Sequence, residues 1–114
     1  MPAVARKSGT DRVFSPHGEN PKTKPKYKMP STQFTNEGSS RVLIGGIGAI
    51  RQGDPMTDHF MVGGLLHSAV APTPPKLDTG SSRVFVEGKG LGRIGDAYGG
   101  DHPIISGSSR VFSG

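Results

Sequence analysis

A repeated seventeen-residue segment constrains this chain more than any other feature of its sequence. The segment GSSRVLIGGIGAIRQGD at positions 38–54 aligns without a gap on GSSRVFVEGKGLGRIGD at positions 80–96, and ten of the seventeen positions are identical. A third copy begins with GSSRVF at positions 107–112. Internal repetition of this kind marks a fold built from equivalent units, so it outweighs local propensity in predicting the architecture.

The three copies read as circularly shifted units of one domain. The half that is missing from the third copy lies at the N-terminus, where ARKSGTD at positions 5–11 imitates the later RQGD and RIGD segments with an insertion. We predict pseudo-repeats at about 5–48, 49–90 and 91–114. Each contains an Arg-x-Gly-Asp turn, a His five or six residues after the acid, a variable connection and a GSSRV strand leading to a glycine-rich turn.

The composition argues against a thick hydrophobic core. Only 32% of the 114 residues are apolar, Trp and Cys are absent, and there are 18 glycines and 10 prolines. A small chain with so little apolar material needs disulfides, a structural metal or a partner, and the lack of Cys excludes disulfides. The four His residues are therefore the first place to look for stabilising contacts.

The local sequence predicts an all-β protein. The segments RVLI and RVFVE, at 41–44 and 83–87, are β-branched and aromatic runs of strand length bounded by Gly-Ser-Ser and Gly-x-Gly. Gly and Pro interrupt every candidate helical period. Residues 18–37 and 61–79, rich in Pro, Lys, Thr and Gly, are predicted to be loop insertions.

Glycines recur at equivalent positions of the first two full copies. Their recurrence predicts turns with positive φ or close approaches of backbone, both of which a side chain would forbid, although plain hairpin turns explain any single glycine equally well. The glycines in question are Gly45, Gly46, Gly48 and Gly53 in one copy and Gly88, Gly90, Gly92 and Gly95 in the next.

The acids after these glycines have two possible roles. Asp54 and Asp96 could form a pair of carboxylates for acid–base chemistry, which requires two acids facing one substrate bond. Their recurrence in each copy favours turn formation instead, with bonds to backbone N–H groups and pairing with Arg51 or Arg93. The recurring serines are likewise predicted to be structural, because no GxSxG segment is present.

The tandem pattern GSSRV-x-x-x-G-x-G-x-x-R-x-G-D, followed by His and another GSS segment, resembles the PAAR-repeat proteins. The segment for which that family is named is degenerate here, since GAIR at 48–51 and GLGR at 90–93 keep the Arg and part of the small-residue character. The resemblance implies a short cone of β-hairpins with a metal near its apex. It implies that one such tip caps the trimeric β-helical spike of a contractile phage tail, tailocin or type VI secretion apparatus.

The resemblance also implies a metal site of three His and one Cys, and this chain has no Cys. His102 stands in the neighbourhood where the family has its Cys. We therefore expect an all-His site formed by His17, His59, His67 and His102. Three of these follow the acid of their unit by five or six residues, whereas His67 stands outside that register.

Four nitrogen ligands in a closed shell suit a structural Zn²⁺ ion, with Fe²⁺ as the alternative. Such an ion would join loops far apart in the sequence and replace part of the missing core. Asp58 and Asp101, each directly before a predicted ligand, are candidate partners for the second ring nitrogen.

The expected partner of the base is the spike trimer, whose sheets the base strands would extend by edge pairing. The tip would meet a target membrane only transiently, and we expect no enzymatic activity, small-molecule substrate or specific nucleic acid. The candidate partner-binding residues are Arg83, Val84, Phe85, Arg110, Val111 and Phe112.

A basic segment supports a second hypothesis. The chain has a net charge of +5, and Lys22–Lys28 places four lysines on one face if the segment is extended. A zinc-stabilised nucleic-acid-binding module would use that face and bind in a salt-sensitive way. Because Tyr27 is the only aromatic residue within it, we favour a solvated loop.

A metallohydrolase is a third hypothesis, which predicts an exchangeable water on the metal. No apolar stretch resembles a signal peptide, so we expect synthesis in the bacterial cytoplasm. In the favoured interpretation the protein ends up in the virion, at the tip of the tail baseplate spike, or in an equivalent secretion particle.

Overall fold

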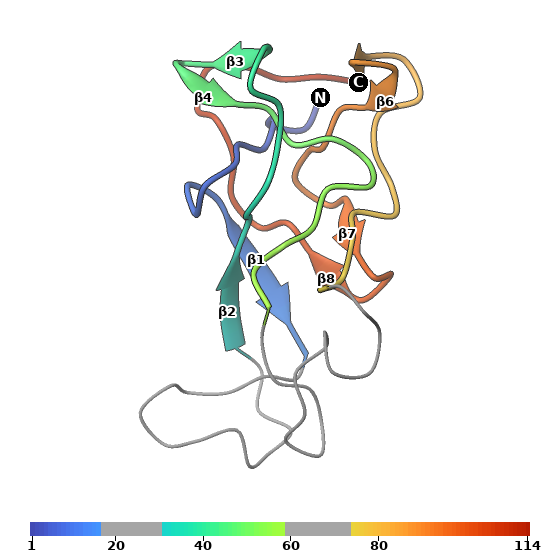
Figure 1. The fold of residues 1–114 in the computed structure, drawn as a ribbon. Helices are drawn as coiled ribbons and strands as arrows, with labels where there is room; N and C mark the ends of the chain where they lie inside the picture. The colour runs from blue at the N-terminus through green and yellow to red at the C-terminus, as the bar shows by residue number, and fades with distance from the viewer. Residues whose placement is uncertain (17–30, 59–73) are drawn as a thin grey trace.

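The computed structural model describes residues 1–16, 31–58 and 74–114. Within these ranges the chain forms short strands and no helix, so the all-β prediction is confirmed (Figure 1). No helix in these ranges is long and apolar enough to cross a membrane. The strands are β1 (Arg12–Ser15), β2 (Ser31–Phe34), β3 (Leu43–Ile44), β4 (Ile47–Gly48), β5 (Phe85–Val86), β6 (Lys89–Gly90), β7 (Ala97–Tyr98) and β8 (His102–Pro103).

The strands pair in sequence order as antiparallel two-stranded sheets, β1 with β2, β3 with β4, β5 with β6 and β7 with β8. The β3–β4 turn has Gly45 and Gly46 at φ 59° and 86°, and the β5–β6 turn has Glu87 and Gly88 at φ 54° and 81°. Two central residues with positive φ are the mark of the two-residue turns that match strand twist. The predicted short hairpins are therefore confirmed.

Three of the recurring glycines, Gly48, Gly90 and Gly92, mark close approaches of the chain, whereas Gly53 and Gly95 have positive φ. A Cβ on Gly90 would lie 2.7 Å from the carbonyl oxygen of Ser81, and one on Gly92 would lie 2.9 Å from side-chain atoms of Ile50 and Leu77. Both proposed reasons for glycine, positive φ and crowding, thus occur in the structure. The tight spacing lets neighbouring units share backbone hydrogen bonds.

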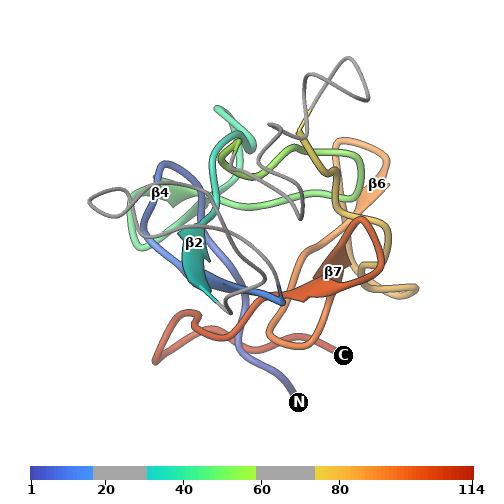
Figure 2. The ribbon, with the colours of Figure 1, turned by 90° about the horizontal axis from the view of Figure 1, so that it is seen from below.

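One segment from each unit contributes to a closed ring of hydrogen bonds at the centre. The Ala5 N–H donates to the Gly92 carbonyl at 3.0 Å, the Gly92 N–H to the Ile50 carbonyl at 2.8 Å, and the Ile50 N–H to the Ala5 carbonyl at 3.2 Å. This cyclic order relates the three units by a quasi-threefold axis. In the view of Figure 2 the chain winds around the centre, with β4 and β6 on opposite sides.

The core consists of two apolar clusters arranged along that axis. The first combines residues that are at most 2% exposed, and the second is smaller and lies nearer the hairpins β3–β4 and β5–β6. The first cluster comprises Ala5, Val13, Ile50, Met56, Leu77, Tyr98 and Ile104. The second comprises Val4, Ala49, Val86 and Leu91, with Ile44 packed against it.

The GSSRV segments begin with a turn, which corrects the prediction that they are strands. The Ser39 hydroxyl oxygen accepts hydrogen bonds from the backbone N–H groups of Arg41 and Val42 at 3.0 and 2.9 Å. Ser81 and Ser108 do the same in their units. Because the serine hydroxyl accepts these N–H groups, they do not pair with a neighbouring strand, and the strands that follow Ser39 and Ser81 are only two residues long.

The predicted loop insertions extend too far, because each includes residues that pair with a distant part of the chain. Residues 18–37 include β2, which pairs with β1, and the buried Thr35, whose hydroxyl donates to the Arg6 carbonyl at 2.6 Å. Residues 61–79 include Leu77, which is 2% exposed and bridges to Tyr98. Pairing with distant strands, rather than composition, gives these polar segments their structure.

Candidate functional site

The Arg-x-Gly-Asp turns are held by partly buried ion pairs, as the sequence predicted. Asp54 Oδ2 accepts from the backbone N–H and Nε of Arg51, both at 2.9 Å, and Arg93 and Asp96 repeat this arrangement. The hydrogen bond to Asp54 raises the pKa of the Arg51 guanidinium. These carboxylates are turn formers with their oxygens engaged, which does not suit a pair of acids facing a substrate.

The N-terminal unit closes the same turn despite its insertion. Asp11 is fully buried and accepts from the backbone N–H, Nε and Nη2 of Arg6 at 2.7 to 3.0 Å. The hydroxyl of Ser106 donates to Asp11 Oδ1 at 2.9 Å, which ties the first and last units together. The first and last units are therefore joined by a side-chain hydrogen bond as well as by the backbone hydrogen bonds at the centre.

One end of the molecule exposes large apolar side chains at equivalent positions of all three units. We call this surface the apolar base. The first residue of each pair has nearly uniform exposure, at 37 to 41%, and the second is exposed at 49 to 58%. The first residues are Val42, Val84 and Val111, and the second residues are Leu43, Phe85 and Phe112.

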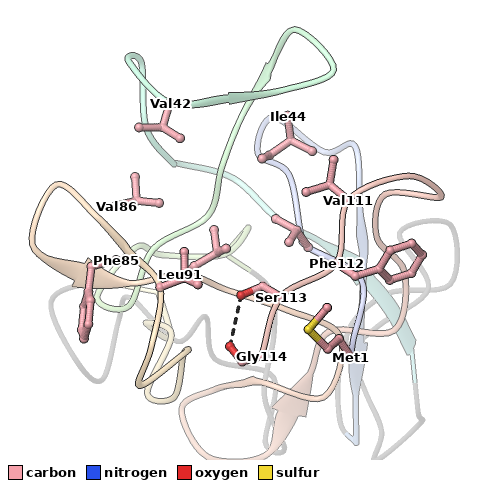
Figure 3. A pocket seen from close by; sticks show the side chains of 12 residues that line it. Met1, Val42, Ile44, Phe85, Val86, Leu91, Val111, Phe112, Ser113 and Gly114 are labelled. Carbon is pink, nitrogen blue, oxygen red and sulfur yellow. Dashed lines mark hydrogen bonds between the residues drawn. The ribbon is translucent and has the colours of Figure 1, made fainter.

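A hollow of about 350 Å³ lies within the apolar base (Figure 3). Phe85 and Phe112 flank it on opposite sides, and Leu91 of the second core cluster contributes to its lining. Both chain ends, Met1 and Gly114, also line it. The apolar core thus continues to the surface at this end. Four of the predicted partner-binding residues line the hollow, namely Val84, Phe85, Val111 and Phe112. The other two, Arg83 and Arg110, are exposed and directly precede Val84 and Val111 in the sequence.

A polar contact between units braces the base. Glu87, in the β5–β6 turn, accepts from the Ser39 hydroxyl at 2.6 Å and from Arg51 Nη1 at 2.9 Å. The Ser39 hydroxyl, followed by the nearby guanidinium groups, lowers the pKa of Glu87. In the next unit the Ser81 hydroxyl donates to a Gly114 oxygen. Each of these serines therefore links its unit to the next at the rim of the base.

His102 lies toward the opposite end of the molecule, at the start of β8 (Figure 1). Its side chain is 1% exposed, and its Nδ1 lies 3.1 Å from the Tyr98 carbonyl oxygen and 2.5 Å from Asp101 Oδ1. A carbonyl oxygen only accepts, so Nδ1 carries the proton and the lone pair of the neutral ring is on Nε2. We call this region the histidine end.

The other predicted ligands, His17, His59 and His67, lie outside the described residues, as does Lys22–Lys28. Among residues 1–16, 31–58 and 74–114 no group of three or more His, Cys, Asp or Glu side chains could hold a metal ion. Of the predicted ligands, His102 alone has a described environment.

Tyr98 is a polar core residue that the sequence analysis missed. Its side chain is fully buried, and within the described part of the chain its hydroxyl has no hydrogen-bond partner. Burial, followed by the charges of Asp54 and Asp11, raises the pKa of this phenol. The alternation of Ala97 and Tyr98 in β7 is too short a signal to have shown which face is buried.

No protein-family model matches the sequence, and a search of curated proteins finds no significant match. The likeness to PAAR-repeat proteins therefore rests on the internal repeat and its motifs.

Proposed function

We propose that this chain is a PAAR-type tip that caps the trimeric spike of a contractile injection machine, with a phage tail baseplate as the favoured setting. The apolar base is the observation that carries this proposal. Its three units offer Val at one position and Leu or Phe at the next, with nearly the same exposure in each unit. A monomer with quasi-threefold chemistry on one face suits a partner with threefold symmetry.

The character of the base favours a permanent contact. Exposed large apolar groups gathered around a hollow mark an interaction surface rather than an ordinary solvated face. Removing them from water contributes about 25 cal/mol for each Å² of apolar surface, which opposes the entropy cost of association. A β-helical trimer would offer each unit an equivalent strand end, so that one tip suffices for three chains.

The histidine end supports the metal in this proposal. His102 is buried, and its Nδ1 lies close to the Tyr98 carbonyl oxygen and Asp101 Oδ1, so Nε2 is the ring nitrogen through which it would bind a metal. His17, His59 and His67 would complete the site, and Zn²⁺ is favoured over Fe²⁺ because a closed set of four nitrogens suits it. When bound, the ion supplies a rigid cross-link between units and no reaction chemistry.

The proposed role is mechanical. The tip would concentrate the force of contraction on a small stiff point that breaches a target membrane, and it would act on no small molecule or specific nucleic acid. Its place would be the end of the spike in the assembled particle.

Native mass spectrometry of the full chain with the spike trimer purified from the same particle tests this function. We expect one tip per trimer, and we expect Val84→Asp with Val111→Asp to abolish the complex. Ile94→Asp is the matched control, because Ile94 is 38% exposed but does not line the hollow. Self-association through the base, or binding that survives both substitutions, would contradict the proposal.

A further inference from the structure

We propose that the partner covering the apolar base places a carboxylate between the third and first units, at the rim of the base. This rests on the proposed function and names the chemistry that the partner must offer. Serine hydroxyls stand at equivalent positions where neighbouring units meet. Among the described residues two of these hydroxyls donate to an oxygen of the next unit, and one does not.

The contact between the first and second units shows which chemistry such a place holds. Glu87 Oε1 accepts from the Ser39 hydroxyl at 2.6 Å and from Arg51 Nη1 at 2.9 Å. Glu87 has φ 54°, a value that residues other than glycine rarely adopt. The charge-assisted bonds to this carboxylate offset the unfavourable backbone conformation.

Alignment of the three copies shows where such an acceptor is missing. Gly114 and Gly45 stand at the position that Glu87 has in the second unit. The Ser81 hydroxyl donates to a Gly114 oxygen, so the second and third units also have a closed contact. Gly45 has no side chain, and a Cβ added to it would meet nothing within 4 Å. The place between the third and first units is therefore open.

The backbone builds this open place as it builds the first contact. The Ser108 N–H donates to the Val4 carbonyl at 2.8 Å, two residues before Arg6. The Lys7 N–H donates at 2.8 Å to the carbonyl of Gly48, in strand β4 of the first unit. The equivalent bonds around the first contact have the same lengths, so the hydroxyl, the guanidinium and the hairpin turn are arranged in the same way.

Two donors are left over at the open place. Ser108 is 7% exposed, and its oxygen accepts from the N–H groups of Arg110 and Val111, but its proton has no acceptor in the described part of the chain. Arg6 binds Asp11 through Nε and Nη2, which leaves Nη1 without a partner among residues 1–16, 31–58 and 74–114. Unpaired donors with little exposure are costly, so an acceptor oxygen from a partner stabilises the complex.

The charge of the base favours an acidic partner as the source of that oxygen. An exposed arginine directly precedes each exposed valine of the base, and the chain has a net charge of +5. Complementary charges across an interface speed association and disfavour wrong partners. The fitting partner surface has an apolar centre bordered by carboxylates, one of which enters the open place. The three arginines are Arg41, Arg83 and Arg110.

Gly45→Glu tests the site without a partner, because it puts a carboxylate at the position equivalent to Glu87. Gly45→Gln is the matched control, since it carries the same backbone strain at φ 59° and nearly the same size but no charge. We expect Gly45→Glu to melt higher than Gly45→Gln, and we expect the difference to vanish when both variants also carry Ser108→Ala. Equal melting temperatures of the two single variants would overturn the carboxylate site.

A titration of the unaltered protein guards against variants that fail to fold. Sodium acetate should shift the amide NMR signals of Arg110 and Val111, which donate to the Ser108 oxygen, and the Nε signal of Arg6. Sodium chloride at the same ionic strength is the control. Equal shifts with the two salts would count against a carboxylate site.

Affinity for the spike trimer purified from the same particle tests the source of the carboxylate. Gly45→Glu should bind the trimer about 10-fold more weakly than Gly45→Gln, because its own carboxylate occupies the place. Equal affinities of the two variants would overturn the partner as the source, even if their melting temperatures differ. A wild type that does not bind the trimer would overturn the proposed function and this occupant together, whereas the melting comparison judges the site itself.

Discussion

The two ends of this molecule differ in how much of their apolar side chains is exposed. Toward the histidine end, the first core cluster closes on itself, and its members are at most 2% exposed. At the apolar base, the second cluster is small and is surrounded by Val, Leu and Phe side chains that are 37 to 58% exposed. The same repeated unit therefore builds a sealed region and an open one.

This difference shows how a repeat with little apolar material is used. Each unit contributes one set of side chains to the closed cluster and another to the base, while the ring through Ala5, Ile50 and Gly92 joins the two regions. The closed region buries polar groups such as Asp11 and His102, which hydrogen bonds stabilise. The open region leaves its apolar side chains exposed.

Removing the proposed metal should give the largest effect, and it should act on the histidine end. Structural Zn²⁺ contributes on the order of 10 kcal/mol to small zinc domains, so a chelator should lower the melting temperature of the wild type steeply. His102→Ala should melt lower at the outset and respond little to the chelator. Thermal unfolding with and without chelator checks both, and a wild type whose melting ignores the chelator would contradict the comparison.

Breaking the Asp11 contact should have the next largest effect, between the two ends. Asp11→Ala leaves the Arg6 guanidinium, which is 24% exposed, without its carboxylate, and removal of one partner from such a pair costs about 3 kcal/mol. Chemical denaturation measures the loss. Arg6→Ala in the same chain should recover part of it, and simple additivity of the two substitutions would argue against the pairing.

Tyr98→Phe should raise stability by about 1 kcal/mol, because it removes a buried hydroxyl that has no partner among the described residues. The pH dependence follows from the raised pKa of this phenol. The unfolded phenol loses its proton near pH 10 while the folded one keeps it, so the wild type should lose stability as the pH rises above about 10. Denaturation from pH 8 to 11 should show a flatter profile in Tyr98→Phe, and identical profiles would refute the buried orphan hydroxyl.

Substitution in the base should have the smallest effect on the isolated chain. Phe112→Ser changes a side chain that is 49% exposed, so we expect a change in unfolding free energy within about 0.5 kcal/mol. Ile50→Ala, in the closed cluster, should cost about 2 to 4 kcal/mol. Equal losses in the two variants, measured by denaturation, would remove the distinction between open and closed regions.

The sequence alone determined the parts of the fold that are local or repeated. The β class, the hairpins with glycine turns and the Arg51–Asp54 and Arg93–Asp96 pairs followed from the repeat, because turn geometry and short-range bonds depend on residues a few positions apart. The circular shift of the units was visible in the same way. The register predicts His102 as a metal ligand; that role stays a prediction, and the structure shows only that the side chain is buried.

Only the tertiary structure decided which surfaces are covered. It placed β2 in a segment whose composition predicts a loop, buried Leu77 and Tyr98, set Asp101 against His102, and left the Val and Phe side chains of the base exposed. These outcomes depend on contacts between residues far apart in the chain, and composition and spacing do not record them. The sequence thus fixes how each unit turns, whereas the packing of three units around one axis selects which face closes and which stays open.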